Sequence, residues 1–219
     1  MKKLILPKLI IFDWDNTLVD SWDIIHDAMM ATFDKLPMKR LWHDKSETQK
    51  NGQYSLRHIF PKIFGDQAIK AGDIYYQEYK MRYLQQLRPL TDANIMLKKL
   101  QDKKICLAVI SNKTHQILLD EIKHLGWENF FADAIGAGYA DFDKPNPAPF
   151  LLLMKNIYGE KPPELDTIWY IGDMNVDVEF ARNNGVVSVM IPMETLHHIP
   201  DRSVKNFDEL LDLVDEIIL

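Results

Sequence analysis

An apolar run at residues 9–12 stops abruptly at two carboxylates, Asp13 and Asp15, and a hydroxyl, Thr17. Such a run predicts a buried strand. Because side chains alternate between the two faces of a strand, Asp13 and Asp15 start on the same side, and Trp14 points away from them. Two carboxylates this close resist ionising together, so the pair indicates a divalent cation, an incoming proton or both. A polar turn explains the same residues, and the stretch taken alone favours that turn.

Residues 19–88 carry a mostly helical pattern. Apolar side chains recur at helical spacing over residues 22–36, and Pro37 ends the run. A second helix is predicted over residues 66–87. Residues 38–65 are polar and irregular, which favours short helical pieces and loops.

From residue 89 onwards the predicted helices and strands alternate, which is typical of a parallel sheet with helical crossovers. We expect strands at 105–110, 132–135, 167–171 and 186–191, and helices at 92–103, 114–125, 147–158, 176–183 and 207–218. The chain therefore divides into an α/β core, residues 1–18 and 89–219, and a helical insertion, residues 19–88.

Three of the expected strands end in polar residues. These are Asp13 and Asp15 after the first strand, Ser111, Asn112 and Lys113 after the second, and Asp173 and Asp177 after the fourth. A single Ser-Asn pair is usually a helix N-cap, and a single Gly-Asp pair is usually a turn. In open parallel sheets, however, ligands bind outside the carboxyl ends of the strands, so we expect these groups to converge in one crevice.

The chemistry of such a crevice follows from its side chains. Asp13, Asp15 and Asp173 offer hard oxygen ligands that suit Mg²⁺. The Ser111 hydroxyl and the N–H groups that begin the next helix can hold an anion. Lys144 adds a positive charge. An exposed loop lysine is the alternative, but two prolines stiffen its loop and weaken that alternative.

A phosphate monoester fits this set of groups. The metal and the lysine would neutralise its charge, one aspartate would attack phosphorus, and a second carboxylic acid would protonate the leaving alkoxide. The residues alone therefore indicate metal-assisted phosphoryl transfer.

With these residues in this order, the chain resembles the haloacid dehalogenase-like superfamily, in the phosphoglycolate-phosphatase-like branch. Four signatures carry the resemblance: DxDx[T/V] at residues 13–17, the hydroxyl at Ser111, the lysine at Lys144, and GDxxxD at residues 172–177. The resemblance implies a Rossmann-like parallel sheet core with helices on both faces, and an α-helical cap inserted after the first strand, at residues 19–88.

The resemblance also implies a role for each matched residue. Asp13 would form an aspartyl-phosphate, and Asp15 would act as general acid and then as base for the hydrolytic water. Mg²⁺ would be held by the Asp13 carboxylate, the Asp15 backbone carbonyl and Asp173, with Asp177 nearby. The phosphoryl group would be bound by Ser111, Asn112 and Lys144, and Thr17 and Arg57 are added as substrate-binding candidates.

Asn16 departs from the branch pattern, which has glycine at this position. Asn tolerates unusual backbone angles better than most residues, so we expect the loop to keep its shape. Dehalogenase members of the superfamily lack the second aspartate, so Asp15 favours phosphate chemistry over carbon–halogen cleavage.

The cap would exclude water during transfer and supply substrate contacts. Its basic candidates are Lys39, Arg40, Arg57 and His58, although a solvated basic face explains each of them. Residues 38–65 carry no pattern that identifies the substrate.

The net charge of −6 and the isoelectric point near 5.6 give no general reason to expect nucleic acid or an anionic membrane as a partner. No apolar run approaches the roughly 18 residues of a membrane span. The single cysteine, Cys106, excludes an internal disulfide. We therefore expect a cytoplasmic monomer or homodimer that acts on a small-molecule phosphate ester.

Three hypotheses follow. The first is an Mg²⁺-dependent phosphatase acting on a small phosphorylated metabolite. The second is a phosphomutase of the β-phosphoglucomutase type, which would use the same site and return the phosphoryl group to a sugar. The third, ranked last, is a non-catalytic interaction protein on the same scaffold.

Overall fold

The computed structural model describes residues 4–38, 40–192 and 196–218. Its main sheet has six strands in the order β5-β4-β1-β6-β7-β8, and all neighbouring strands are parallel. The strands are β1 (Leu9–Phe12), β4 (Cys106–Thr114), β5 (Ala134–Ala137), β6 (Ile168–Gly172), β7 (Val187–Met190) and β8 (Arg202–Ser203). Phe12 pairs with Val109 on one side and Ile171 on the other, so the residues that follow β1, β4 and β6 meet at one edge of the sheet.

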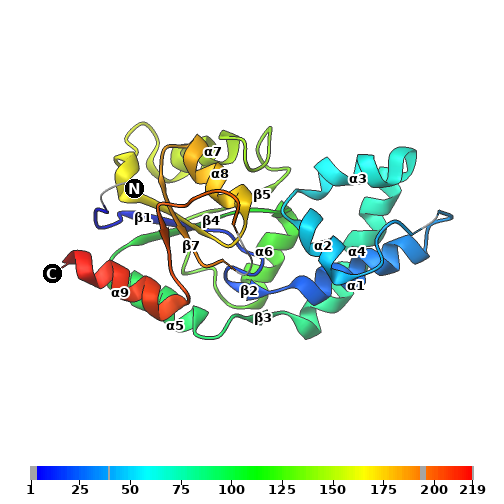
Figure 1. Ribbon diagram of the computed structural model, residues 1–219, viewed down its shortest axis with the longest axis horizontal. Coiled ribbons are helices and arrows are strands. Elements are labelled where there is room, and N and C mark those ends of the chain that lie inside the picture. Colours follow the sequence, from blue (N-terminus) through cyan, green and yellow to red (C-terminus); the bar gives the residue numbers. More distant parts are fainter. Residues whose placement is uncertain (1–3, 39, 193–195, 219) are drawn as a thin grey trace.

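Helices cover both faces of this sheet (Figure 1). They are α5 (Ala93–Asp102), α6 (His115–His124), α7 (Ala148–Tyr158), α8 (Asn175–Asn183) and α9 (Phe207–Ile218). Alternate residues of β1 belong to two apolar clusters: Ile11 packs with α7 and α8, and Ile10 with α5, α6 and α9. A short 3₁₀ helix, η2 (Leu165–Thr167), precedes β6. The predicted α/β fold, a parallel sheet with helices on both faces, is confirmed.

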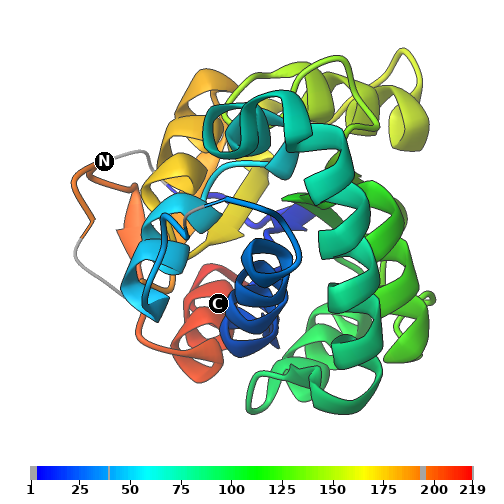
Figure 2. The same cartoon turned by 90° about the vertical axis from the view of Figure 1, so that its right-hand side faces the viewer.

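A helical insertion follows β1. Its helices are α1 (Trp22–Asp34), α2 (Lys45–Gly52), α3 (Leu56–Phe64) and α4 (Ala68–Gln86), with the 3₁₀ helix η1 (Gly65–Gln67) before α4. Figure 2 looks onto the end of the molecule where these helices lie. Two short strands, β2 (Val19–Asp20) and β3 (Arg88–Pro89), pair antiparallel at the two ends of the insertion. We therefore keep residues 19–88 as the proposed extent of the cap and residues 1–18 and 89–219 as the proposed core.

One strand is longer than its apolar pattern indicates. β4 continues to Thr114, four residues past the predicted end at Ile110, and its pairing with β5 shifts register between these two residues. The sequence signal ends early because the strand passes from apolar to polar side chains while it stays extended. Ser111 and Asn112 therefore lie on the strand itself.

None of the described helices is both long enough and apolar enough to cross a membrane.

Candidate active site

The first acidic residues lie in a tight turn directly after β1. The backbone N–H of Asp13 still donates to Ile171, 2.8 Å away, and the chain then folds back so that Leu18 donates to the carbonyl of Trp14 at 2.9 Å. Asn16 takes a φ of +58°, in the left-handed region that Asn tolerates better than most side chains. The loop is therefore built on an unusual backbone angle at the residue where the family pattern has glycine.

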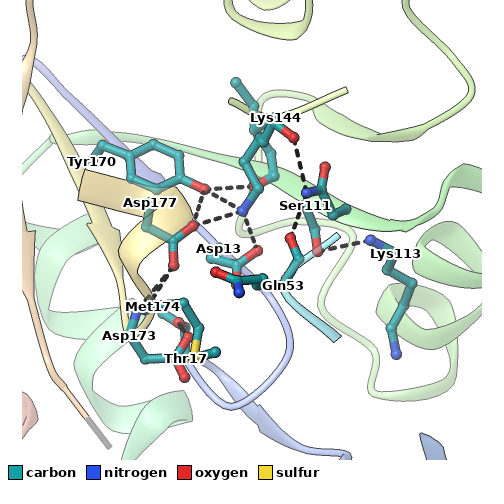
Figure 3. A network of polar contacts seen from close by, with 12 residues as sticks. Asp13, Thr17, Gln53, Ser111, Lys113, Lys144, Tyr170, Asp173, Met174 and Asp177 are labelled. Carbon is teal, nitrogen blue, oxygen red and sulfur yellow. Dashed lines mark hydrogen bonds and ion pairs between the residues drawn. The ribbon is translucent and has the colours of Figure 1, made fainter. Parts of the chain in front are cut away.

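Lys144 is the charged centre of the first polar network (Figure 3). Its Nζ lies 2.7 Å from Asp13 Oδ1, 2.8 Å from Asp177 Oδ1 and 2.7 Å from the Tyr170 hydroxyl. The side chain is only 1% exposed, so an exposed loop lysine is excluded. Burial alone would lower the pKa of Lys144, but Asp13 and Asp177 outweigh it and raise this pKa to about 12. Lys144 therefore presents a fixed positive charge beside Asp13.

Three carboxylates crowd around this lysine. Asp13, Asp173 and Asp177 are all buried, and each offers an oxygen within 4.8 Å of the others. Burial raises the pKa of Asp13 to about 6, against the lowering effect of Lys144, and burial raises the pKa of Asp173 well above its ordinary value. A cation in this cluster would remove the cost of ionising these groups together.

Within the cluster the carboxylate oxygens are used differently. Asp177 Oδ2 accepts hydrogen bonds from the N–H groups of Asp173 and Met174, at 3.2 and 3.0 Å. Asp173 Oδ1 accepts from the Thr17 hydroxyl at 3.1 Å. Its Oδ2 is buried and has no hydrogen-bond partner in the described part of the chain. Hard divalent cations bind carboxylate oxygens, and the unpaired Oδ2 of Asp173 lies close to Asp13. A cation bound there would give this buried oxygen a partner, so these residues fit such a metal.

Gly172 lets the acidic segment take this shape. A Cβ at this position would lie 2.5 Å from the carboxyl group of Asp177. The missing side chain therefore makes room for Asp177 to reach back over the end of β6.

A second buried network holds Asp15. Lys113 Nζ lies 2.7 Å from Asp15 Oδ1 and 3.0 Å from Glu121 Oε2. The Ser21 hydroxyl donates to the same Asp15 oxygen at 2.6 Å, and the Tyr79 hydroxyl donates to Glu121 Oε1 at 2.6 Å. Burial opposes the charge on Lys113, but the two carboxylates outweigh it and raise the pKa of Lys113. Asp15 is therefore held by a charged partner that the sequence reasoning did not assign.

One signal for these missed residues was present in the sequence. Glu121 lies on the apolar face of α6, beside Ile117 and Leu118, and a carboxylate in such a position needs a buried partner. Trp14, predicted to point away from the aspartates, donates its indole N–H to Glu121 at 2.6 Å and so belongs to the same network. Tyr170, in contrast, lies within an apolar strand and gave no signal.

Ser111 and Asn112 lie where the strand-end argument predicts. Ser111 is buried, and its Oγ accepts from the N–H of Lys113 at 3.2 Å. Asn112 Nδ2 donates to the carbonyl of Gln53 at 2.8 Å and to that of Lys144 at 3.1 Å. Asn112 therefore joins a cap residue to the lysine loop.

Arg57 is not brought to this cluster. Its Nε lies 2.6 Å from Asp143 Oδ2, and its Nη2 donates to the carbonyls of Ala140 and Asp141 at 3.3 and 3.0 Å. In this structure Arg57 connects the cap to a core loop, and its role in substrate binding stays a prediction.

The other basic cap candidates also lie elsewhere. Arg40 pairs with Asp34, and His58 contacts Lys62. Lys39 lies outside the described residues.

A cavity of about 60 Å³ lies between the cap and the core, at the carboxyl ends of the strands. Its core wall includes Asp13, Asp15, Ser111, Asn112, Lys113 and Lys144. Both networks therefore reach the same cavity.

The chain matches the family model described as haloacid dehalogenase-like hydrolase over residues 10–191. It is 25% identical to a phosphoglycolate phosphatase of Aquifex aeolicus, across 97% of this chain and 99% of that protein. It is 22% identical to the pyrophosphatase PpaX of Halalkalibacterium halodurans, across 94% of this chain and 95% of that protein.

Two solved structures share the fold. A haloacid dehalogenase-like family hydrolase from Streptococcus pneumoniae superposes with a TM-score of 0.77 at 23% identity, across 94% of this chain and 98% of that one. CbbY from Rhodobacter sphaeroides, solved in complex with phosphate, superposes with a TM-score of 0.81 at 14% identity, across 95% and 99%.

Proposed function

Since the chain belongs to the haloacid dehalogenase-like hydrolases, we propose that it is a metal-dependent phosphatase that hydrolyses a small phosphate ester through an aspartyl-phosphate on Asp13. The observation that carries this proposal is the position of Asp13. Its carboxylate lines the cavity, is held by Lys144 at 2.7 Å, and lies beside the unpaired oxygen of Asp173. The relatives named phosphoglycolate phosphatase and pyrophosphatase support a small phosphorylated substrate.

In the first step a carboxylate oxygen of Asp13 attacks phosphorus and the bond from phosphorus to the leaving oxygen breaks. Asp15, as the carboxylic acid, gives its proton to that oxygen. In the second step Asp15 takes a proton from water, the water oxygen attacks the same phosphorus, and inorganic phosphate leaves as the Asp13 carboxylate is regenerated. Lys113 and Ser21 act through Asp15, because both hold its Oδ1.

We assign Ser111, Asn112 and Lys144 to the phosphoryl oxygens. Lys144 supplies a compact positive charge, and Ser111 supplies a hydroxyl donor. Asn112 Oδ1 is buried without a partner among the described residues, while its Nδ2 is occupied by two carbonyls. Lys144 and Ser111 would therefore make the main contacts to the phosphoryl oxygens. Asn112 Nδ2 would join them only after its hydrogen bond to the Gln53 carbonyl breaks.

We propose Mg²⁺ as the metal, held by the carboxylates of Asp13 and Asp173 and by the backbone carbonyl of Asp15. Bound there, it would neutralise phosphoryl charge as the bond to the leaving group breaks. Asp177 would stay beside the metal, because its oxygens are already held by Lys144 and two backbone N–H groups. The hydrogen bond from Thr17 to Asp173 favours a role for Thr17 in orienting that ligand.

The test is release of inorganic phosphate from a panel of phosphorylated metabolites by the purified protein with Mg²⁺. Asp13→Asn should abolish release while the circular dichroism spectrum stays that of the wild type. Asp212→Asn, on an exposed position of α9, is the matched control and should keep full activity. Unchanged turnover in Asp13→Asn would refute the mechanism, and an isomerised sugar phosphate without phosphate release would identify a phosphomutase instead.

A further inference from the structure

The cap wall of the cavity is apolar and aromatic. Nine of its side chains are Trp22, Ile25, Met29, Trp42, Tyr54, Leu56, Ile59, Tyr75 and Tyr79. The core adds Ile117, Met174 and Val176 around the same space. A substrate whose phosphoryl group lies at Asp13 would therefore place its leaving group against this wall.

Two polar cap residues at the wall, Thr48 and Gln53, already have hydrogen-bond partners. The Thr48 hydroxyl lies 2.9 Å from His26 Nδ1. The Gln53 side chain donates to the carbonyl of Lys50 at 3.1 Å, and the Gln53 carbonyl accepts from Asn112. Neither residue directs an unused charged group towards a ligand.

The cations at the cavity belong to the core and are paired with carboxylates. Among the lining residues that the structure describes, the cations are Lys113 and Lys144, and each lies between two carboxylates. If Lys113 turned to a substrate, the carboxylate of Glu121 would be left fully buried without its charged partner. A second anionic group on the substrate would therefore be buried at the cap without a partner, which is costly.

We infer that the substrate is a phosphate monoester with an uncharged and largely apolar leaving group. This inference rests on the proposed phosphatase function and narrows its substrate class. The cap wall does not suit the carboxylate of phosphoglycolate or the second phosphate of pyrophosphate.

The experiment compares monoesters whose leaving alcohols have similar basicity. Benzyl phosphate offers an apolar ring, ethyl phosphate lacks it, and phosphoglycolate replaces it with a carboxylate. With Mg²⁺ present, we expect kcat/KM for benzyl phosphate to exceed that for each of the other two at least about tenfold, because apolar area is buried. Equal or better turnover of phosphoglycolate would overturn the inference.

Binding of non-hydrolysable analogues separates this inference from the proposed function. We expect 2-phenylethylphosphonate to bind at least about tenfold more tightly than propylphosphonate or 3-phosphonopropionate in calorimetry with Mg²⁺. This order without turnover of any ester would refute the phosphatase and leave the ligand class standing. The reverse order would refute the ligand class whether or not esters are hydrolysed.

A variant tests the wall itself. Ile25 lines the cavity and is partly exposed, so a lysine there can keep its ammonium group hydrated. Ile25→Lys should shift the preference at least about tenfold towards phosphoglycolate and 3-phosphonopropionate, whereas Ile25→Met should keep the wild-type order. No shift in either ester preference or phosphonate binding would contradict the assignment of this wall to the leaving group.

Discussion

Buried Lys113 and partly buried Asp15 form an ion pair at the carboxyl ends of the strands, with Nζ 2.7 Å from Oδ1. Lys113 comes from the polar end of β4, and Asp15 from the turn after β1. Ser21, at the start of the cap, donates to the same Asp15 oxygen. The proposed acid/base is therefore held from the core and from the cap at once, so its position depends on both.

Lys113→Met should lower kcat about a hundredfold with a smaller change in KM, because Asp15 loses the cation that positions it. The variant also leaves Glu121 buried without its charged partner, so the free energy of unfolding should fall by about 3 kcal/mol. Steady-state kinetics and urea unfolding measure the two effects.

The double variant Lys113→Met/Glu121→Gln separates positioning from stability. The neutral amide removes the uncompensated charge and can still accept from Tyr79, so stability should largely return while kcat stays low. Recovery of kcat together with stability would mean that Lys113 acts only through folding.

Metal binding should stabilise the fold through Asp173. After treatment with EDTA, adding Mg²⁺ at ten times its Kd should raise the free energy of unfolding by about 1.4 kcal/mol. Asp173→Asn should lose this response while its metal-free form unfolds no more easily than the wild type, because the substitution removes a buried charge. Thermal unfolding with and without Mg²⁺ measures this, and an equal response in Asp173→Asn would refute the assignment.

Arg57 should affect activity through its contact with the core loop. Arg57→Met should raise KM a few-fold and change stability by less than about 1 kcal/mol, because the Arg57 side chain is 44% exposed. If Arg57 acts through Asp143, the double variant Arg57→Met/Asp143→Asn should match the more impaired single variant. Additive losses in this cycle would instead support the direct substrate contact predicted from the sequence.

Glu78 should give the cap helices a stability that depends on pH. Hydrogen bonds from Lys35, the residue directly after α1, and from Arg82 on α4 lower the pKa of Glu78. A lowered pKa means that the unfolded chain binds this proton more readily, so the contribution is present above about pH 4.3 and is lost as the pH falls through the folded pKa.

Glu78→Gln should therefore reduce the free energy of unfolding by about 1 kcal/mol at pH 7 and by progressively less as the pH falls through the folded pKa of Glu78. Urea unfolding over a series of acidic pH values measures this, and a loss that does not change with pH would contradict the ion-pair explanation.

The sequence predicted the meeting of Asp13 and Asp173 because their placement follows from topology. Parallel strands bring their carboxyl ends to one edge, so polar residues that directly follow apolar runs converge there. Asn16 was also predictable, since Asn is one of the few side chains that accept the left-handed turn found at this position.

The partners of Lys113 were not predictable in the same way. Glu121 and Tyr79 come from α6 and α4, and local periodicity places each on a helix face without saying which faces meet. Arg57 shows the same limit, because a basic residue in the cap is compatible with a substrate, solvent or the core loop. Tertiary packing decides which of these partners a basic cap residue contacts, and in this structure Arg57 contacts Asp143 of the core loop.

Gly52 should matter because Trp22 packs directly against it. A Cβ at Gly52 would lie 2.5 Å from the Trp22 ring, so Gly52→Ala must move a side chain of the proposed leaving-group wall. We expect KM for benzyl phosphate to rise several-fold and stability to fall by about 1 kcal/mol.

Gly72 is the matched control for this change. It lies within α4, and a Cβ there would meet nothing within 4 Å. Gly72→Ala should therefore stabilise the protein by about 0.5 to 1 kcal/mol and leave KM unchanged, because alanine restricts the unfolded chain. Steady-state kinetics and thermal unfolding of both variants decide the matter. An unchanged KM in Gly52→Ala would show that Trp22 can move without affecting the leaving-group site, and the wall would then have to be assigned to the other cap side chains.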